Sequence, residues 1–417
     1  MDAYNVMPSF PHHHLKLLYL FAIIASVLLS SWLNSQAIVN SDGVLYLQAA
    51  QAYALEGWDA AVAVYKWPFY SAAIAWTQTL TSLSLVNSAY ALNTLLCVVI
   101  VTAFIQLIGA LGGRLQEQVF AAVIILLHTG LNDYRDYIIR DLGHWAFMLY
   151  GLYFLILYSK KRQLRFALGF GLAMFTAFLF RTEALFVMLL APLTLLFCNE
   201  HQYTFLKRLV HFLGAYSFAP VILTAVLIVY MIGPSELTQV QLSNPWLSRL
   251  EHIDYLRALE TQIMQLRPAI SANIPDNHLY YFLFGGFMAY FLVRLCLLLS
   301  PLYVLLTGYA IKQGLMKASP ARALLCTYLI IYTLIVLGFL YYRFFLSGRY
   351  IMPIVLLLSL WAPFALSAWY EAWRSSKPGV VGKPWFFPLV IMGLIYMLGD
   401  SSISSTHLGF LTQTWYE

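Results

Sequence analysis

The 417-residue chain is too apolar for an ordinary soluble protein, because 61% of its residues are hydrophobic and only 10% are charged, against about 45–50% and about 25% in soluble domains. Its net charge of +6 does not indicate nucleic-acid binding, since Lys and Arg form short clusters between apolar stretches rather than one basic run. We therefore predict an all-α polytopic membrane protein, with residues 1–417 forming a single transmembrane domain and with membrane lipids rather than nucleic acid as its surroundings.

Eleven apolar stretches are candidate membrane spans. The first follows Lys16 and ends near Ser35-Gln36-Ala37, a tripeptide that resembles a signal-peptide cleavage site. Because a series of further spans follows it, we favour an uncleaved membrane helix. The eleven stretches cover residues 17–36, 86–111, 118–132, 142–158, 165–180, 184–198, 209–232, 279–308, 323–342, 350–370 and 385–399.

The lysines orient these spans. If the N-terminus is cytoplasmic, eight of the nine lysines fall in cytoplasmic loops and only Lys66 lies outside, as the positive-inside rule predicts. Eleven spans then place the C-terminus outside. Fourteen of the eighteen acidic residues also fall outside, and this bias calls for an explanation other than topology.

Two outer loops are long. The first, residues 37–85, contains the stretch from Pro68 to Val86, which is apolar but rich in Thr and Ser. We interpret that stretch as interfacial rather than spanning, although its length leaves both readings open. The second loop, residues 233–278, is polar and contains four prolines, and its segment 246–266 is predicted to be an amphipathic helix on the membrane surface.

Acidic residues near the outer ends of spans are candidates for catalysis. Asp42 follows the first span and suits either a helix N-cap or a general base for an acceptor hydroxyl or amine. Asp136 and Asp141 lie in a run of five charges after the third span, which is either a solvated cap or a second acidic site. We favour Asp141, because His144 follows it into the next span, where a hydrogen bond between helices is the commoner role of a histidine.

Arginines on the same side suggest an anionic ligand. Arg181 and Glu183 lie between two apolar segments of about 15 residues, which reach about 22 Å and therefore hold the pair below the outer surface of a core about 30 Å thick. A charged pair at that depth is expected to line a wet cavity or to pair internally. Arg343 and Arg349 flank another outer boundary. Interface anchoring would explain any one of them, but together with Lys66 they favour binding of phosphate.

No cofactor is indicated. The chain has neither a phosphate-cradling loop nor a dinucleotide fingerprint, and a divalent metal is possible but no ligand spacing points to one. The His12-His13-His14 tract is interpreted as incidental. The four cysteines lie in or at the ends of apolar stretches without paired spacing and are expected to be free thiols; they are Cys97, Cys198, Cys296 and Cys326.

Five motifs follow one another along the chain. They are Asp42-x-x-x-Tyr46 with Ala49-x-x-Tyr53-x-x-x-Gly57, Tyr65-Lys66-Trp67-Pro68-Phe69-Tyr70, Tyr137-x-x-Arg140-Asp141-x-x-x-Trp145, Phe180-Arg181-Thr182-Glu183-Ala184-Leu185 and Ser347-Gly348-Arg349-Tyr350-Ile351-Met352-Pro353. Together they resemble membrane glycosyltransferases of the GT-C fold, and the protein O-mannosyltransferases and bacterial aminoarabinose transferases in particular. The chain departs from many of these relatives in having Gly43 rather than a Glu after Asp42, and we find no counterpart of their large soluble C-terminal domain.

The resemblance implies an inverting enzyme in a bacterial inner membrane that uses a polyprenyl-phosphate-linked sugar. By resemblance, Asp42 is the base, Asp141 is a second acid, and the donor phosphate is held by Lys66, Arg181 and Arg349. Further residues are expected to support them, namely Tyr46, Asp136, Arg140, His144, Glu183, Arg343 and Tyr350. The acceptor, whether lipid, glycan or protein, does not follow from the resemblance.

Two other functions share these features. A transporter or lipid flippase would line its path with such charges, but transporters place them near the midplane in paired repeats, whereas here they lie at span ends. An O-antigen polymerase or ligase would instead depend on the long loop 233–278.

Overall fold

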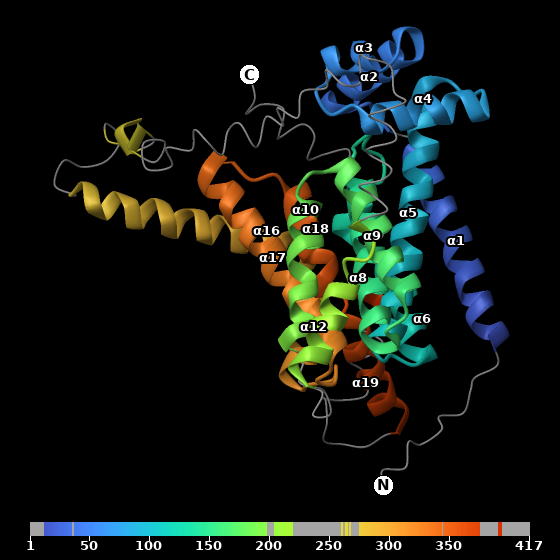
Figure 1. Cartoon of the computed structure of the whole chain (residues 1–417), viewed down its shortest axis with the longest axis vertical. Coiled ribbons are helices and arrows are strands. Elements are labelled where there is room, and N and C mark those ends of the chain that lie inside the picture. Colours follow the sequence, from blue (N-terminus) through green and yellow to red (C-terminus); the bar gives the residue numbers. More distant parts are fainter. Residues whose placement is uncertain are drawn as a thin grey trace.

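The protein is described by a computed structural model that covers residues 12–35, 37–197, 204–219, 260–261, 263–265, 267, 275–343, 345–375 and 391–393. Every regular element within these ranges is helical. Most of the long helices run side by side as a bundle, and the first part of α16 (Asp276–Lys312) projects from it at the left of the view (Figure 1). The predicted helical fold class is therefore confirmed. The second outer loop, 233–278, with its predicted amphipathic helix, lies almost entirely outside the described residues.

Six described helices or helical runs are long and apolar enough to cross a membrane, which identifies the chain as an integral membrane protein. They are α1 (His12–Asn34), α5 (Leu85–Ala110), α8 (Asp141–Lys161), α16 (Asp276–Lys312), α17 (Pro320–Arg343), and α18 (Gly348–Ser359) continued by α19 (Ala362–Ser375). Shorter apolar helices accompany them: α6 (Leu115–Leu126), α9 (Leu164–Phe180), and the run of α10 (Ala184–Leu190), η1 (Ala191–Leu193) and α11 (Thr194–Phe197).

The count of eleven spans stays a prediction. Most of the stretches 209–232 and 385–399 lies outside the described residues, and α12 (Phe205–Gly214) contains only the beginning of the first. The stretch 118–132 is two helices, because α6 ends at Leu126 and α7 (Thr129–Asn132) starts after His128. The His128 ring accepts a hydrogen bond from the Leu131 N–H at 3.3 Å, which replaces a backbone bond at the break.

Three short helices gather at one end of the bundle, at the top of Figure 1: α2 (Ser41–Glu56), α3 (Trp58–Val64) and α4 (Phe69–Thr81). Gly57 separates α2 from α3 with a φ of 89°, a left-handed conformation that suits glycine. The stretch 68–86 thus forms α4 and the start of α5. With 13 residues, α4 is about 20 Å long and too short to cross the hydrocarbon core.

Helix α8 is the central element of the site because it packs against α5, α9, α17 and α18. Gly143 permits its closest approach to α9, since a Cβ at this position would lie 2.4 Å from the Phe180 ring. The close packing brings the start of α8 next to the end of α9. Asp141, the first residue of α8, therefore lies beside Arg181, which follows α9.

Candidate active site

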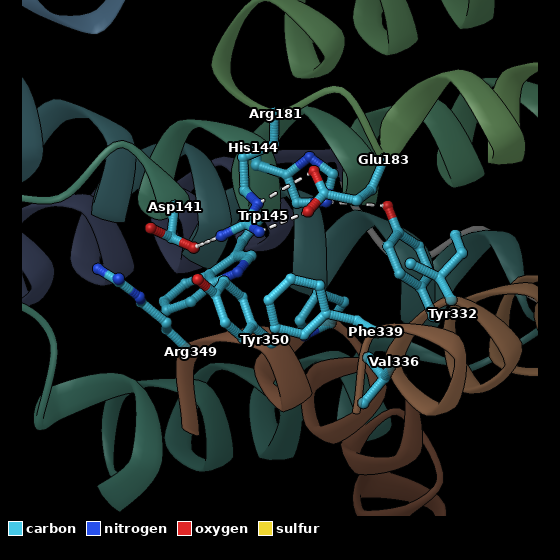
Figure 2. Close-up of a pocket in the computed structure, with 12 residues that line it drawn as sticks. Asp141, His144, Trp145, Arg181, Glu183, Tyr332, Val336, Phe339, Arg349 and Tyr350 are labelled. Atoms are coloured by element: carbon cyan, nitrogen blue, oxygen red, sulfur yellow. Dashed lines mark hydrogen bonds and ion pairs between the residues drawn. The ribbon is translucent and has the colours of Figure 1, made fainter. Parts of the chain in front are cut away.

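A pocket opens among the helix ends nearest to the short helices α2, α3 and α4. It encloses about 360 Å³, part of which is open to solvent. Charged residues occupy one side, and apolar residues of α17 and α18 form the other (Figure 2). The lining residues are Asp141, His144, Trp145, Arg181, Glu183, Tyr332, Ile335, Val336, Phe339, Arg349, Tyr350 and Pro353.

Arg181 lies between two carboxylates, and we call Asp141, Arg181 and Glu183 the Arg181 triad. One guanidinium nitrogen, Nη1, donates to Asp141 Oδ1, while Nη2 donates to Glu183 Oε1 at 2.5 Å and Nε to Glu183 Oε2 at 3.3 Å. The side chains of Arg181, Asp141 and Glu183 are only 9%, 1% and 20% exposed. The expectation that this pair of charges lines a cavity or pairs internally is confirmed, since it does both.

The electrostatics of the triad keep its charges in place. Burial alone would raise the pKa of Glu183, but the charge and hydrogen bonds of Arg181 outweigh it and lower the pKa to about 2. Burial likewise disfavours the charged form of Arg181, yet Glu183 and Asp141 hold its pKa well above the usual value. Arg181 and Glu183 are therefore both ionised at neutral pH.

A second ion pair, the Arg349 pair, joins the first loop to the C-terminal half of the chain. Arg349 Nη1 donates to Asp42 Oδ2, with side-chain exposures of 24% and 39%. Asp42 lies in the first turn of α2, and Arg349 is the second residue of α18. The Tyr350 ring contacts both guanidinium groups, with its centroid 4.5 Å from Arg181 Cζ and 5.5 Å from Arg349 Cζ. Two predicted phosphate ligands thus share one aromatic neighbour.

His144 connects three helices at the inner side of the pocket. Its Nε2 lies 3.1 Å from the hydroxyl of Tyr332 in α17, and its Nδ1 lies 3.4 Å from the carbonyl oxygen of Ala177 in α9. This is the hydrogen-bonded histidine between helices that the sequence suggested as the commoner role. It supports the pocket wall rather than reaching into the Arg349 pair.

The remaining predicted residues lie around the pocket without lining it. Tyr46 is buried against Tyr65, whose ring also carries the Arg140 guanidinium at 5.5 Å. Lys66 and Arg343 are exposed, and Arg343 lies over the Tyr342 ring at 5.3 Å. The structure therefore brings Arg181 and Arg349 together but keeps Lys66 apart from them.

Asp136 lies in the segment between α7 and α8. Burial raises its pKa to about 6, so that it titrates in a range where an ordinary Asp is fully charged. Asp136 does not line the pocket. Of the two acids considered for the second acidic site, Asp141 is the one that does.

Two residues escaped the sequence analysis. Tyr332 lines the pocket from the middle of an apolar span, and its only signal is the i, i+4 spacing with Tyr328, which is also buried. Arg135 belongs to the charged run for which the sequence allows either a solvated cap or a second acidic site, and it is 0% exposed. Its Nη1 donates to the hydroxyls of Ser26 and Ser30 in α1 at 3.1 and 2.9 Å.

No group of three or more His, Cys, Asp or Glu side chains suited to a metal ion occurs in the described part of the chain. The three acids of the site, Asp42, Asp141 and Glu183, each pair with an arginine.

Neither a scan against models of known protein families nor a search of curated proteins finds a match. Solved structures of the oligosaccharyltransferase AglB from Archaeoglobus fulgidus do match. The complex with an inhibitory peptide and a dolichol-phosphate has a TM-score of 0.52 at 11% identity, covering 94% of this chain and 56% of that one. The complex with Zn and sulfate has a TM-score of 0.59 at 13% identity, covering 93% of this chain and 52% of that one. The enzyme tethered to an acceptor peptide has a TM-score of 0.55 at 12% identity, covering 93% of this chain and 55% of that one.

This chain spans about half the length of the AglB chains it matches. At such low identity the similarity establishes the fold, which is the GT-C fold of membrane glycosyltransferases. The GT-C resemblance seen in the sequence is confirmed at this level. Its narrower part, the likeness to protein O-mannosyltransferases and aminoarabinose transferases, stays a prediction.

Proposed function

We propose that the protein is a membrane glycosyltransferase that moves a sugar from a polyprenyl-phosphate donor to an acceptor at the outer face of the membrane. The observation that carries this proposal is the Arg349 pair, which sets a partly exposed acid and an arginine beside a pocket with a charged side and an apolar side. Such a pocket suits a phosphate attached to an isoprenoid chain. The AglB neighbours, which share the fold, include a complex with a dolichol-phosphate and an inhibitory peptide.

The helix ends around the pocket support an anionic ligand. Asp42 lies in the first turn of α2 and Asp141 in the first turn of α8, where carboxylates interact favourably with the helix dipole. The first turn of α18 has no acidic residue, and Ser347, its N-cap, makes no side-chain capping bond. Backbone N–H groups and Arg349 at this helix start therefore suit a phosphate from a ligand.

In the proposed reaction, Asp42 accepts the proton of an acceptor hydroxyl or amine while the acceptor atom attacks the anomeric carbon. The bond between that carbon and the phosphate oxygen breaks, and the lipid phosphate leaves with the electron pair, so the configuration inverts. Arg349 stabilises the charge that develops on the leaving phosphate. Asp141 keeps Arg181 in position beside it.

The membrane placement belongs to the same proposal. Eleven spans with a cytoplasmic N-terminus would put the site on the outer face of a bacterial inner membrane, where the donor enters laterally from the bilayer. Lys66, exposed in the first loop, would meet the donor phosphate only on closure of that loop. The acceptor is a lipid, a glycan or a protein.

The proposal is tested by transfer from labelled polyprenyl-phosphate sugars in reconstituted vesicles, with mass spectrometry of the product. We expect Asp42→Asn to lose at least about 100-fold in rate, as for removal of a general base, with unchanged expression and insertion. The matched control is Asp59→Asn, which removes an exposed carboxylate from α3 in the same loop and should retain full activity. Turnover by Asp42→Asn would reject Asp42 as the base, and translocation of the lipid without sugar transfer would favour a flippase.

A further inference from the structure

We infer that the Arg349 pair is an exchangeable contact in which Asp42 occupies the place of the donor phosphate. Donor binding would displace the carboxylate from Arg349, and only then would Asp42 be free to accept a proton from the acceptor. The enzyme would thus bind donor before acceptor. This inference rests on the proposed function and adds to it the order of binding and the physical cause of that order.

The two arginines differ in how readily they can exchange a partner. Arg181 is held by Asp141 and Glu183, and breaking that triad would leave charges that are almost fully buried without a partner, which is strongly destabilising. Arg349 forms an ion pair with one carboxylate, Asp42, which is 39% exposed, while Asp141 acts on its charge from a greater distance and stays in place. A released Asp42 is solvated at once, so an incoming phosphate can replace it at little cost.

Arg349 keeps its position when Asp42 leaves. Its guanidinium contacts the Tyr350 ring, and its backbone belongs to the first turn of α18. Its Nε is buried and has no hydrogen-bond partner among the described residues. A phosphate offers several acceptor oxygens, so in place of Asp42 it can take Nη1 together with Nη2 in the bidentate manner that a guanidinium favours.

Asp42 stays near the site after release. Asn40, the residue that precedes α2, accepts a hydrogen bond from the Ile138 N–H at 2.9 Å and so ties the start of α2 to the segment that leads into α8. The change therefore requires rotation of one side chain, not movement of a helix. The freed carboxylate remains beside the pocket, where the acceptor must arrive.

The charges of the two ion-paired groups also favour exchange over simple addition. The three carboxylates, Asp42, Asp141 and Glu183, outnumber the two arginines in these groups. A phosphate added to this site would meet an excess of negative charge, with both arginines already engaged. When Asp42 moves away from Arg349, the carboxylate that would repel the phosphate most strongly is removed. The same movement makes the Arg349 guanidinium available to the phosphate.

The test is the affinity of the purified, detergent-solubilised protein for polyprenyl phosphate without sugar or acceptor. We expect Asp42→Asn and Asp42→Ala to bind it about three- to tenfold more tightly than the wild type, because the competing carboxylate is gone. Asp59→Asn, the matched removal of a carboxylate from the same loop, should bind as the wild type does. Arg349→Met should bind more weakly, and Asp42→Asn should restore nothing when combined with it.

Unchanged or weaker binding by both Asp42 variants, each folded as judged by thermal unfolding, would overturn the exchange. If the wild type nevertheless transfers sugar, the proposed function is retained and only the exchange is rejected. Tighter binding by the Asp42 variants without any sugar transfer by the wild type would support the exchange and reject the transferase. Initial-rate kinetics give a second check, since donor-first binding makes a dead-end acceptor analogue uncompetitive toward the donor.

Discussion

At the residue scale, the site contains two arginines, Arg181 and Arg349, that differ in burial and in the number of their partners. Arg181 is buried and shared between two carboxylates, whereas Arg349 has a single partly exposed partner. In the proposed function, identical guanidinium groups thus serve as a fixed structural charge at Arg181 and as a ligand for the donor phosphate at Arg349. Burial and the number of partners decide the difference. The short segments around Arg181 indicate its burial, but the pairing of Arg349 with Asp42 is not visible in the local sequence.

We predict that Arg181→Met destabilises the fold more than Glu183→Gln. Loss of the cation leaves Asp141 and Glu183 facing each other with little access to water, a change worth about 3–5 kcal/mol. In Glu183→Gln, by contrast, the amide oxygen of the new side chain can still accept a bond from Arg181. The melting temperatures of both variants are measured by thermal unfolding in detergent, with size-exclusion chromatography as the readout. Equal melting temperatures for the two variants would show that Arg181 does not stabilise Asp141 and Glu183 together.

The pH dependence of the Glu183→Gln effect follows from the lowered pKa of Glu183. The contribution of a carboxylate whose pKa falls from 4.5 to about 2 on folding is fully present above about pH 4.5 and is lost as pH falls toward 2. The difference in melting temperature between this variant and the wild type should accordingly stay constant from about pH 8 to about pH 5.

Asp136 should behave in the opposite way. Burial raises its pKa from 3.8 to about 6, so ionisation destabilises the folded chain as pH rises through this range. Asp136→Asn is expected to raise the melting temperature at about pH 7.5 and to leave it unchanged near about pH 4. A variant that is less stable than the wild type at the higher pH would mean that the charged form of Asp136 is satisfied.

At the scale of elements, a buried arginine attaches the outermost helix of the bundle. Arg135 bonds Ser26 and Ser30 on α1 and also Asn132 Oδ1 at 2.7 Å, and α1 is otherwise poorly buried, with 17% of its apolar window inside the protein. The contact spans 105 residues between Ser30 and Arg135. These polar contacts therefore add to the packing of α1 against α5 and α6.

We expect Ser30→Ala to destabilise the protein by about 1–3 kcal/mol, because it leaves a buried guanidinium with one donor more unsatisfied. Leu28→Ala is the matched control on the same helix, since Leu28 is 65% exposed. Thermal unfolding or limited proteolysis of α1 compares the two. A larger effect for Leu28→Ala would place the attachment of α1 in apolar contacts instead.

The elements were more predictable from the sequence than their contacts. Apolar length located the six described helices that are long enough to span a membrane, and the short segments around Arg181 predicted that its charge lines a cavity or pairs internally. The same reasoning did not single out Arg135, because a charged, aromatic run at a helix end also has the composition of a solvated cap. The one available signal was the spacing of Ser26 and Ser30, which puts two hydroxyls on one face of α1.

At the scale of the whole molecule, the fold is shared with AglB although only 11–13% of the residues are identical. What the similarity leaves open is orientation in the membrane, which the lysine distribution predicts. Pairings such as Asp42 with Arg349 could not be inferred from the sequence either, because they depend on how distant helices pack. The order of the motifs along the chain made Asp42 and Arg349 candidate site residues, but it did not predict that they contact each other.

Orientation is tested by labelling single cysteines in intact cells, in a background without the native cysteines. Glu56→Cys, exposed at the end of α2, should react with an impermeant reagent added outside, and Gln313→Cys, exposed between α16 and α17, should be protected. Permeabilised cells serve as the control, since both sites should then react. The reverse labelling pattern would invert the proposed topology and put the site in the cytoplasm.

The Arg349 pair also has a consequence for biogenesis. Its two residues are 307 positions apart, so α2 is made and inserted long before α18 exists. Until then Asp42 has no cation and the Arg181 triad lacks the Tyr350 ring. Under the proposed function, a ribosome-bound or truncated chain would contain most of the bundle without a competent site, which would form only when α18 joins the first loop.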